Sequence, residues 1–467
     1  MIRKEETICA PATSGGGAIA VIRISGSGSI EICDTIFFPA DNRIRFRDQK
    51  GYSIVFGEIR SGEEIIDDVL VSLFRAPHSY TGEDAVEISC HASPYIQQRI
   101  LELLIRNGAV IARPGEFTQR AFLNGKMDLS QAEAVADLVA SESAAAHRVA
   151  VSQIRGSFSD EIRILRADLL HFASLIELEL DFGEEDVEFA DRKKLRDIVS
   201  RVLSMARGLS SSFNLGNAIK NGVPVAIAGK SNTGKSTLLN YLLKEEKAIV
   251  SEIPGTTRDV IEDTIVIDGI KYRFSDTAGL RDTVDIVENI GIKRTYEKIG
   301  LASMILLVAD VNEDPRALKE VLDDLRRKIS ERGTKLVVLV NKIDSDSQNK
   351  RASFNDNNII QPGETIIFIS AKTGEGIDSL KEAMGKLIGS DHLTAENVIV
   401  TNARHYSALN QVSESLERVI DGLDNQIPED LIAIDIRQAI HYLGEITGEI
   451  TTDEILENIF KNFCIGK

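Results

Sequence analysis

Two stretches of the chain carry short apolar runs separated by turn residues, a pattern that predicts β-strands. In the first stretch, runs rich in β-forming residues at 18–24, 69–74 and 85–89 alternate with Gly, Pro and Ser turns. We therefore expect residues 1–122 to form an α+β domain. In the second stretch, between about residues 217 and 385, apolar runs end at short polar motifs.

Apolar residues spaced three or four apart dominate much of the rest of the chain and predict helices. Ser130 and Glu133 form a capping box, which marks a helix start. The helical pattern covers residues 165–180, 195–209, 405–423, 431–443 and 453–460. Because these segments flank the second strand-rich stretch, we expect that stretch to be inserted into a helical domain. The predicted divisions are 1–122, 123–216, 217–385 and 386–467, with hinges at 214–221 and 389–397.

Length, composition and charge limit the kinds of protein that this chain can be. A chain of 467 residues has ample material for several domains. It has no run near the roughly 18 apolar residues of a membrane span and no signal-peptide core, so we expect a cytoplasmic protein with no membrane contact. The cysteines Cys9, Cys33, Cys90 and Cys464 lack metal-ligand spacing. Lys and Arg number 54 against 72 Asp and Glu, a net charge of −18, so any RNA contact should be local.

Residues 229–236 read GKSNTGKS, which is the GxxxxGKS phosphate loop. The apolar run 223–228 precedes this loop and the helical stretch 237–243 follows it, as the motif requires. Glycines let the backbone approach phosphate closely, and the loop amides point at the anion. Lys235 is expected to reach the terminal phosphates and Ser236 to hold Mg²⁺. The predicted nucleotide-binding residues here are Asn232, Thr233, Gly234, Lys235, Ser236 and Thr237.

Further motifs at strand ends identify the nucleotide as GTP. Asp344 can accept both edge N–H groups of guanine, whereas adenine presents an acceptor there. An alanine amide after the run 365–369 could read the guanine carbonyl. Thr257 is the expected second Mg²⁺ hydroxyl. The remaining motif residues are Asn341 and Lys342, then Ser370, Ala371 and Lys372, and Asp276, Thr277, Ala278 and Gly279 for Mg²⁺ and the γ-phosphate. Residues 217–385 thus resemble a translation-factor-type GTPase domain, which has a mainly parallel central sheet.

Leu280 stands where Ras-like enzymes place a glutamine that orients the attacking water. A leucine cannot polarise water, so another group must do so. Glu288, at the predicted start of the next helix, is the candidate, acting directly or through a bridging water. The alternative is a solvated glutamate that the helix dipole favours.

The sequence also suggests a bound monovalent cation, which would compensate negative charge on the leaving phosphates. The side-chain oxygen of Asn232 could bind such an ion, and oxygens of residues 251–256 could complete its cage. A potassium ion there would supply fixed charge against the developing negative charge, as an arginine finger does. The alternative for Asn232 is a side chain that shapes the loop.

The last residues, FCIGK, fit a prenylation box poorly. Read alone, Cys464 is a small thiol near a frayed tail. Together with the inserted GTPase domain, this tail resembles the C(I/L/V)GK ending of the MnmE (TrmE) family of tRNA modification GTPases. Four N-terminal motifs agree, namely GGGAIAVIRISG at 15–26, SYTGED at 79–84, RPGEFT at 113–118 and RAFLNGK at 120–126.

The resemblance implies a potassium-activated GTPase in which Asn232, Ser251, Ile253 and Thr256 match the cation positions and Glu288 the catalytic glutamate. Lys235 matches the phosphate-loop lysine, and Cys464 matches a cysteine beside the folate pocket. Ser231 and Ser251 depart from the usual proline and threonine, which bears on cation affinity. The resemblance also implies an N-terminal domain that binds 5-formyltetrahydrofolate, or another tetrahydrofolate one-carbon donor, and forms a homodimer. Its folate-contacting positions match Arg23, Glu87, Lys126 and Lys467.

The family works on tRNA with a flavoprotein partner, MnmG, in a heterotetramer. Together they install an aminomethyl-type group, carboxymethylaminomethyl, on carbon 5 of the wobble uridine. The GTPase motifs alone are equally compatible with a regulatory GTPase of ribosome assembly, and only the flanking domains and the cysteine-bearing tail separate these two hypotheses.

Overall fold

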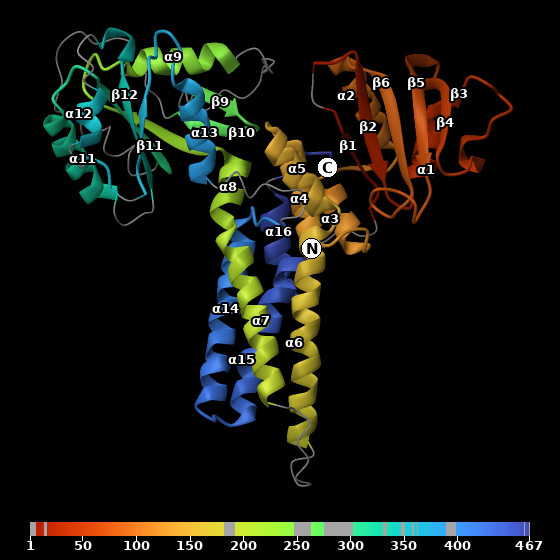
Figure 1. The fold of residues 1–467 in the computed structure, drawn as a ribbon. Helices are drawn as coiled ribbons and strands as arrows, with labels where there is room; N and C mark the ends of the chain where they lie inside the picture. The colour runs from red at the N-terminus through yellow and green to blue at the C-terminus, as the bar shows by residue number, and fades with distance from the viewer. Residues whose placement is uncertain are drawn as a thin grey trace. The chain divides into compact units, whose positions relative to one another are not determined.

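In the computed structural model, the chain forms two compact units. Figure 1 labels helices and strands of both. Unit 1 comprises Met1–Val139, Val151–Ser204 and Ala408–Lys467, and unit 2 comprises Ala140–Ala150 and Met205–Ser407. The structure describes residues 6–13, 16–181, 192–246, 263–274, 302–329, 334–346, 351–356, 359–361, 363–388, 398–461 and 463–466.

Unit 1 contains a seven-stranded sheet in the order β3-β4-β5-β6-β2-β1-β7. Neighbouring strands are antiparallel except for β1 and β7, which are parallel. The strands are β1 (Ile8–Pro11), β2 (Ile19–Ser25), β3 (Phe37–Pro39), β4 (Ser53–Ser61), β5 (Glu64–Phe74), β6 (Ala85–His91) and β7 (Val110–Ile111). This sheet and its helices confirm the predicted α+β character of the N-terminal region.

One face of this sheet is covered and the other carries exposed apolar residues. Helices α1 (Ser29–Ile36) and α2 (Pro94–Arg106) share one core cluster with the inward residues of β2, β4, β5 and β6. On the opposite face, Ile54, Phe56 and Leu70 remain 68%, 55% and 48% exposed. Side chains alternate along a strand, so Arg23 and Glu87 also lie on this second face, between buried neighbours of the core cluster.

The helices of unit 1 follow the predicted spacing of apolar residues. They are α3 (Glu116–Leu123), α4 (Leu129–Val139), α6 (Ser157–Asp181), α15 (Glu429–Thr447) and α16 (Asp453–Phe460), with parts of α7 (Arg192–Ser211) and α14 (Ala403–Asp424). Helix α6 packs along α15, and Leu165 and Leu169 on α6 are fully buried, one turn apart. Among the described residues, no helix combines the length and apolar character needed to cross a bilayer.

The predicted capping box at Ser130 is wrong by two residues. Helix α4 begins at Leu129, so Ser130 lies inside it. Asp128 is the cap, because its Oδ1 accepts a hydrogen bond from the Gln131 amide at 3.0 Å. In return, Oε1 of Gln131 accepts from the Asp128 amide at 2.9 Å, which completes a reciprocal pair of the capping-box type.

Unit 2 contains a six-stranded sheet in the order β13-β12-β11-β8-β10-β9. Its strands are β8 (Val223–Ala228), β9 (Asp263–Ile267), β10 (Ile270–Phe274), β11 (Met304–Asp310), β12 (Lys335–Asn341) and β13 (Thr365–Phe368). All neighbouring pairs are parallel except the hairpin β9–β10. The mainly parallel sheet predicted for the inserted domain is therefore confirmed.

Both faces of this sheet are covered, which explains why its central strands read as continuous apolar runs. Helices α9 (Lys235–Glu246) and α13 (Ile377–Ile388) pack on one face with Met304, Leu306 and Val308 of β11. Helices α11 (Pro315–Ile329) and α12 (Arg351–Asp356) pack on the other face with the intervening residues of β11.

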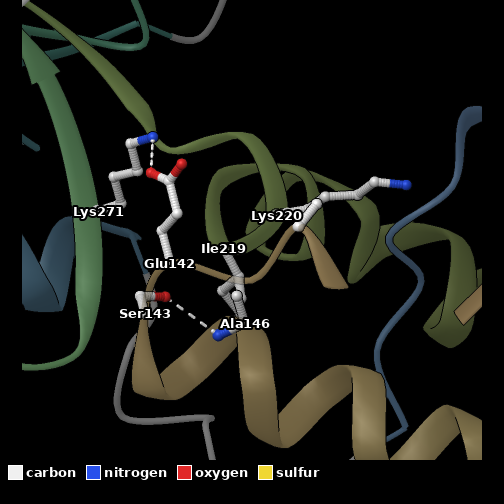
Figure 2. Close-up of a pocket in the computed structure, with 7 residues that line it drawn as sticks. Glu142, Ser143, Ala146, Ile219, Lys220 and Lys271 are labelled. Atoms are coloured by element: carbon white, nitrogen blue, oxygen red, sulfur yellow. Dashed lines mark hydrogen bonds and ion pairs between the residues drawn. The ribbon is translucent and has the colours of Figure 1, made fainter. Parts of the chain in front are cut away.

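The tip of the β9–β10 hairpin lies against the segment Ala140–Ala150 within unit 2 (Figure 2). Asp268 and Gly269 form the turn, with φ of 51° and 80°. The carbonyl of Gly269 accepts a hydrogen bond from the Ala145 amide at 3.2 Å, and Lys271 pairs with Glu142 at 2.5 Å. The first half of α5 (Ala144–Ile154) is thereby attached to the sheet of unit 2.

The chain enters and leaves the main part of unit 2 at neighbouring points. The Val400 amide donates a hydrogen bond to Oγ of Ser212 at 3.0 Å, and the rings of Phe213 and Tyr406 stack at 4.5 Å. Residues 214–221, predicted as a hinge, belong to helix α8 (Phe213–Asn221). The second predicted hinge, 389–397, lies outside the described residues.

Candidate functional site

The phosphate loop, residues 229–236, follows β8 and needs glycine at two positions. Gly229 has φ of 140°, and a Cβ there would lie 2.2 Å from the carbonyl oxygen of Val308. Gly234 has φ of 100°, and its Cβ would lie 2.2 Å from Nδ2 of Asn341. Side chains at either position would push the loop away from its neighbours. Asn232 takes a left-handed conformation with φ of 62° and is exposed.

Lys235 begins helix α9 and lies in the curve of the loop. Its Nζ donates to the carbonyls of Gly229 at 2.8 Å and Lys230 at 2.5 Å. Burial lowers the pKa of this ammonium, and the nearby carboxylate of Glu313 opposes that shift only in part. Ser236 and Thr237 follow in the first turn of α9, where unpaired amides favour an anion.

Asn341, at the end of β12, connects the phosphate loop to the loop after β13. This side chain is 2% exposed. Its Nδ2 donates to the carbonyl of Thr233 at 2.8 Å, and its Oδ1 accepts from the Ala371 amide at 2.9 Å. Three motifs that are far apart in the sequence therefore meet at one side chain.

The predicted guanine-reading carboxylate is fixed by a hydroxyl. Oγ of Ser370 donates to Oδ1 of Asp344 at 2.7 Å, and the Thr373 amide donates to the same Oγ at 3.2 Å. Lys372 is exposed on the same loop. These contacts fix the orientation of the Asp344 carboxylate, which is the type of acceptor that can pair with the edge N–H groups of guanine.

Lys342 takes a left-handed conformation and supports the adjacent strand end. Its Nζ pairs with Oδ2 of Asp310 at 2.7 Å. Burial raises the pKa of Asp310, but hydrogen bonds from Lys342 and Asn312 outweigh this effect and leave the pKa below its ordinary value.

The described part of this site fits a guanine nucleotide with Mg²⁺. The loops all follow parallel strands, so their polar groups gather at the carboxyl edge of the sheet. Loop amides and Lys235 supply positive charge for phosphates, the Ser236 hydroxyl is a Mg²⁺ ligand type, and Asp344 supplies a fixed acceptor. The other predicted residues of the GTPase site lie outside the described residues, namely Ser251, Ile253, Thr256, Thr257, Asp276, Thr277, Ala278, Gly279 and Glu288.

A second polar site lies on the open face of the sheet in unit 1. Arg23 on β2 pairs with Glu87 on β6, with Nε and one terminal nitrogen each 2.9 Å from Oε1. The other terminal nitrogen of Arg23 donates to the carbonyl of Gly466 at 3.3 Å. The rings of Tyr80 and Phe117 lie 5.4 and 5.6 Å from the guanidinium carbon, within cation–π range.

The C-terminal tail reaches this site through tight backbone contacts. The carbonyl of Cys464 accepts from the Gly115 amide at 3.3 Å, while the Cys464 residue is exposed. Gly466 is buried, and a Cβ there would lie 2.0 Å from the carbonyl oxygen of Pro11. Lys467 lies outside the described residues.

Lys126 lies on the turn after α3 and holds the loop that carries Tyr80. Its Nζ donates to the carbonyl of Pro77 at 3.0 Å, and a Cβ at Gly82 would lie 3.3 Å from its Cγ. The structure thus brings Arg23 and Glu87 together with the tail and connects Lys126 to the Tyr80 loop. A carboxylate and two cations among aromatic rings are group types that suit a pterin ring with carboxylate-bearing substituents.

The cysteines differ in environment. Cys9, Cys33 and Cys90 are buried, and Cys464 is exposed. Burial raises the pKa of the Cys9 and Cys90 thiols to about 11 each, with the Asp67 carboxylate adding to the shift at Cys90. Because the thiolate is the reactive form, the exposed cysteine is the one that can engage a reactant.

Tyr80 and Phe117 had no predicted role, although they belong to the SYTGED and RPGEFT motifs. The missed signal is that each motif contains an aromatic residue, which can flank a cation. Asn341 was predicted to bind nucleotide, without the two loop contacts that the structure shows.

Comparisons with known proteins place the chain in a family. Family models described as "MnmE helical domain" and "GTP-binding protein TrmE N-terminus" match residues 129–464 and 7–126. A tRNA modification GTPase MnmE from Bacteroides thetaiotaomicron is 53% identical over 99% of this chain and 100% of the relative. One from Christiangramia forsetii is 50% identical, with both chains covered completely.

Among solved structures, the G domain of the T. maritima FeoB iron transporter is 26% identical, covering 35% of this chain and 98% of its own, with a TM-score of 0.26. The full-length relatives and the two family models, together with the assembled GTPase motifs, lead to one conclusion. The chain belongs to the MnmE family of tRNA modification GTPases.

Proposed function

We propose that this tRNA modification GTPase is activated by potassium and works with a flavoprotein partner, MnmG. The pair would install a carboxymethylaminomethyl group on carbon 5 of the tRNA wobble uridine in the cytoplasm. One observation carries this proposal. The chain combines a GTPase-type site at the carboxyl edge of the sheet in unit 2 with a second polar site in unit 1. This second site contains Arg23, Glu87 and the tail with the exposed Cys464. A regulatory GTPase of ribosome assembly has no need of the second site.

Residues 1–122 are proposed to bind folate and form the dimer, and residues 217–385 to hydrolyse GTP. The helical parts, 123–216 and 386–467, connect them. In hydrolysis, Lys235 would neutralise the terminal phosphates, while Ser236, Thr257 and Asp276 would hold Mg²⁺. Glu288 would orient the attacking water, because Leu280 cannot.

Potassium is proposed to act beside Asn232, with oxygens of Ser251, Ile253 and Thr256. The exposed, left-handed position of Asn232 supports this, since its amide oxygen can reach a ligand outside the loop. Turnover should be faster in potassium than in sodium at equal ionic strength. Equal rates in the two salts would remove the proposal, and Asn232→Ala should abolish the difference between them.

The one-carbon donor is proposed to be 5-formyltetrahydrofolate, or another tetrahydrofolate. Glu87 would accept N–H groups of the pterin, and the cations of Arg23, Lys126 and Lys467 would meet its carboxylates. The cation–π geometry of Arg23 with Tyr80 and Phe117 supports a site that also accepts a flat ring. Cys464 is proposed to act beside this pocket.

The open sheet face is proposed to form the homodimer interface, to which MnmG adds in a heterotetramer. Ile54, Phe56 and Leu70 form an exposed apolar row next to the polar site, which is unusual for a free surface. Phe56→Glu should shift the chain toward monomers in size-exclusion chromatography with light scattering. Ile164→Glu, on the exposed side of α6, is the matched control that should leave the oligomeric state unchanged.

Nucleoside analysis of tRNA tests the function as a whole. Cells that lack the protein should lose the modified wobble uridine, and the unmodified gene should restore it. Glu288→Ala should bind GTP and fail to restore the modification. Unaltered wobble uridines in the deletion strain would favour the ribosome-assembly function instead.

A further inference from the structure

A buried arginine lies beside the polar site of unit 1. Arg120, on α3, is 3% exposed and contacts two carboxylates. One of its terminal nitrogens lies 3.3 and 3.1 Å from the two oxygens of Glu83. The other lies 3.2 Å from Oε1 of Glu116. The carboxylates are themselves only 19% and 8% exposed.

We propose that Arg120 is a positioning residue for folate binding, a role that rests on the folate function proposed above. It holds the segment 79–84 against helix α3. This segment carries Tyr80, which flanks Arg23, and it runs so close to the stem of Lys126 that a Cβ at Gly82 would lie 3.3 Å from the Lys126 Cγ. Arg120 therefore acts on the site through the segment and not by touching the ligand.

Further hydrogen bonds show that the segment is held as one piece. Oγ of Ser25 donates to Oε2 of Glu83 at 2.7 Å and lies 2.7 Å from Oγ1 of Thr81. Nδ2 of Asn124, at the end of α3, donates to the carbonyl of Thr81 at 2.8 Å. These contacts connect the end of β2, the segment and α3, so a shift at Glu83 is passed on to the residues on either side of it.

The hydroxyl of Tyr80 provides the direct connection to the site. It lies 2.9 Å from Oγ1 of Thr118 on the same helix as Arg120. Burial raises the pKa of Tyr80, and the hydrogen bond with Thr118 and the charge of Arg23 oppose this shift only in part. The ring is thus fixed at one end by α3, and its face lies toward the Arg23 guanidinium.

Charge makes Arg120 difficult to replace. It is the cation shared by two poorly exposed carboxylates, which would repel each other and lose their compensating charge without it. A neutral side chain of similar length keeps some packing but not this charge. Segment 79–84 would then separate from α3, and Tyr80 and Lys126 would lose their positions beside Arg23.

A purely structural salt bridge is the competing explanation, and the experiment separates the two. Binding of 5-formyltetrahydrofolate to the full chain is measured by calorimetry for the unmodified protein and for Arg120→Gln, Arg120→Lys and Arg99→Gln. Arg99 is the matched control, because it lies in the same unit and pairs with Glu64 and Glu102. We expect Arg120→Gln to raise Kd at least tenfold, Arg120→Lys to give an intermediate value, and Arg99→Gln to leave Kd unchanged.

Hydrogen exchange tests whether the substitution acts through this segment rather than through loss of structure in the whole unit, while the Kd shows whether folate binding depends on it. In Arg120→Gln, amides of residues 79–84 should exchange faster while the strands of the sheet keep their protection. A folded Arg120→Gln whose Kd stays within twofold of the unmodified chain would overturn the inference. If that variant fails to fold, Glu83→Gln replaces it, and an unchanged Kd there would overturn the inference equally. Absence of folate binding by the unmodified chain would overturn both the proposed folate site and this inference, whereas loss of binding in Arg23→Ala supports the site independently.

Discussion

Replacing Asn341 by alanine tests whether one side chain holds the two nucleotide-contacting loops together. The change removes a donor to the Thr233 carbonyl and an acceptor for the Ala371 amide. Each buried polar group left without a partner costs about 1–3 kcal/mol. Partial relief by water brings the expected total to roughly 2–4 kcal/mol. At about 1.4 kcal/mol per tenfold change, GDP affinity should fall by roughly 30-fold to several hundred-fold.

The assay is release of a fluorescent GDP analogue followed by stopped flow, with affinity from titration. Asn425→Ala is the control, because that side chain is exposed and donates to the carbonyl of Asp421 on α14, outside the nucleotide-binding site. The dissociation rate should rise far more than the association rate falls, since the loops lose their fixed positions. A GDP affinity within threefold of the unmodified protein would show that the two hydrogen bonds do not organise the site.

A double substitution sharpens the test. Gly234→Ala places a methyl group 2.2 Å from Nδ2 of Asn341, so it displaces the same amide. The strained φ of 100° adds about 1–2 kcal/mol that no other change can relieve. Combining Gly234→Ala with Asn341→Ala should therefore cost less than the sum of the single changes, whereas additivity would mean that the two residues do not interact.

Three further predictions concern residues outside the nucleotide-binding site. Glu364→Gln should lower the free energy of unfolding by about 2 kcal/mol at pH 7. Burial raises the pKa of this carboxyl, but hydrogen bonds led by Arg326 lower it below the ordinary value of 4.5, so the carboxylate stabilises the fold above that pH. The stabilisation is lost as pH falls through the lowered pKa, so the difference in urea unfolding between the two proteins should shrink below pH 4.5. Gly466→Ala should weaken folate binding severalfold in a calorimetric titration, since its methyl group would meet the carbonyl of Pro11 at 2.0 Å and move the tail; an unchanged Kd would contradict the tail's part in the site. Gly269→Ala should cost about 1–2 kcal/mol in urea unfolding because φ is 80°, and a loss below about 0.3 kcal/mol would argue against a strained turn.

Elements with clear ends could be predicted closely from the sequence. The run 223–228 is bounded by two glycines with positive φ, and it coincides with β8. The stretch 453–460 coincides with α16, whose cap Thr452 accepts a hydrogen bond from the Ile455 amide. In both cases the local signals for start and stop agree with the period of the apolar residues.

The errors came from signals that fit more than one position. Ser130 and Glu133 match a capping box, but Asp128 and Gln131 match it too, and the latter pair lies where the chain turns into the helix. Residues 214–221, predicted as a hinge, form part of helix α8, and Ile219 is buried in the core of unit 2, so the sequence did not reveal that this segment is a packed helix. Burial outweighed local propensity there.

The residue types of the candidate sites could be predicted from motifs, but their connections could not. Asn341 reaches Thr233 across 108 positions of the sequence and Ala371 across 30. Arg120 and Glu83 are 37 positions apart. No pattern in one segment shows which distant segment will lie opposite, because the fold of the whole unit determines it.

The chain enters and leaves the main part of unit 2 at neighbouring points, Ser212 and Val400, and this position bears on how the protein can be truncated. Because a hydrogen bond and a pair of stacked rings hold the two segments side by side there, a short linker can replace the residues between Ser212 and Val400 while the remaining helices keep their connections. A truncated protein made in this way should still form the remaining helices and the N-terminal sheet. Its weak point would be the alanines at the start of α5, whose cover comes from the removed hairpin.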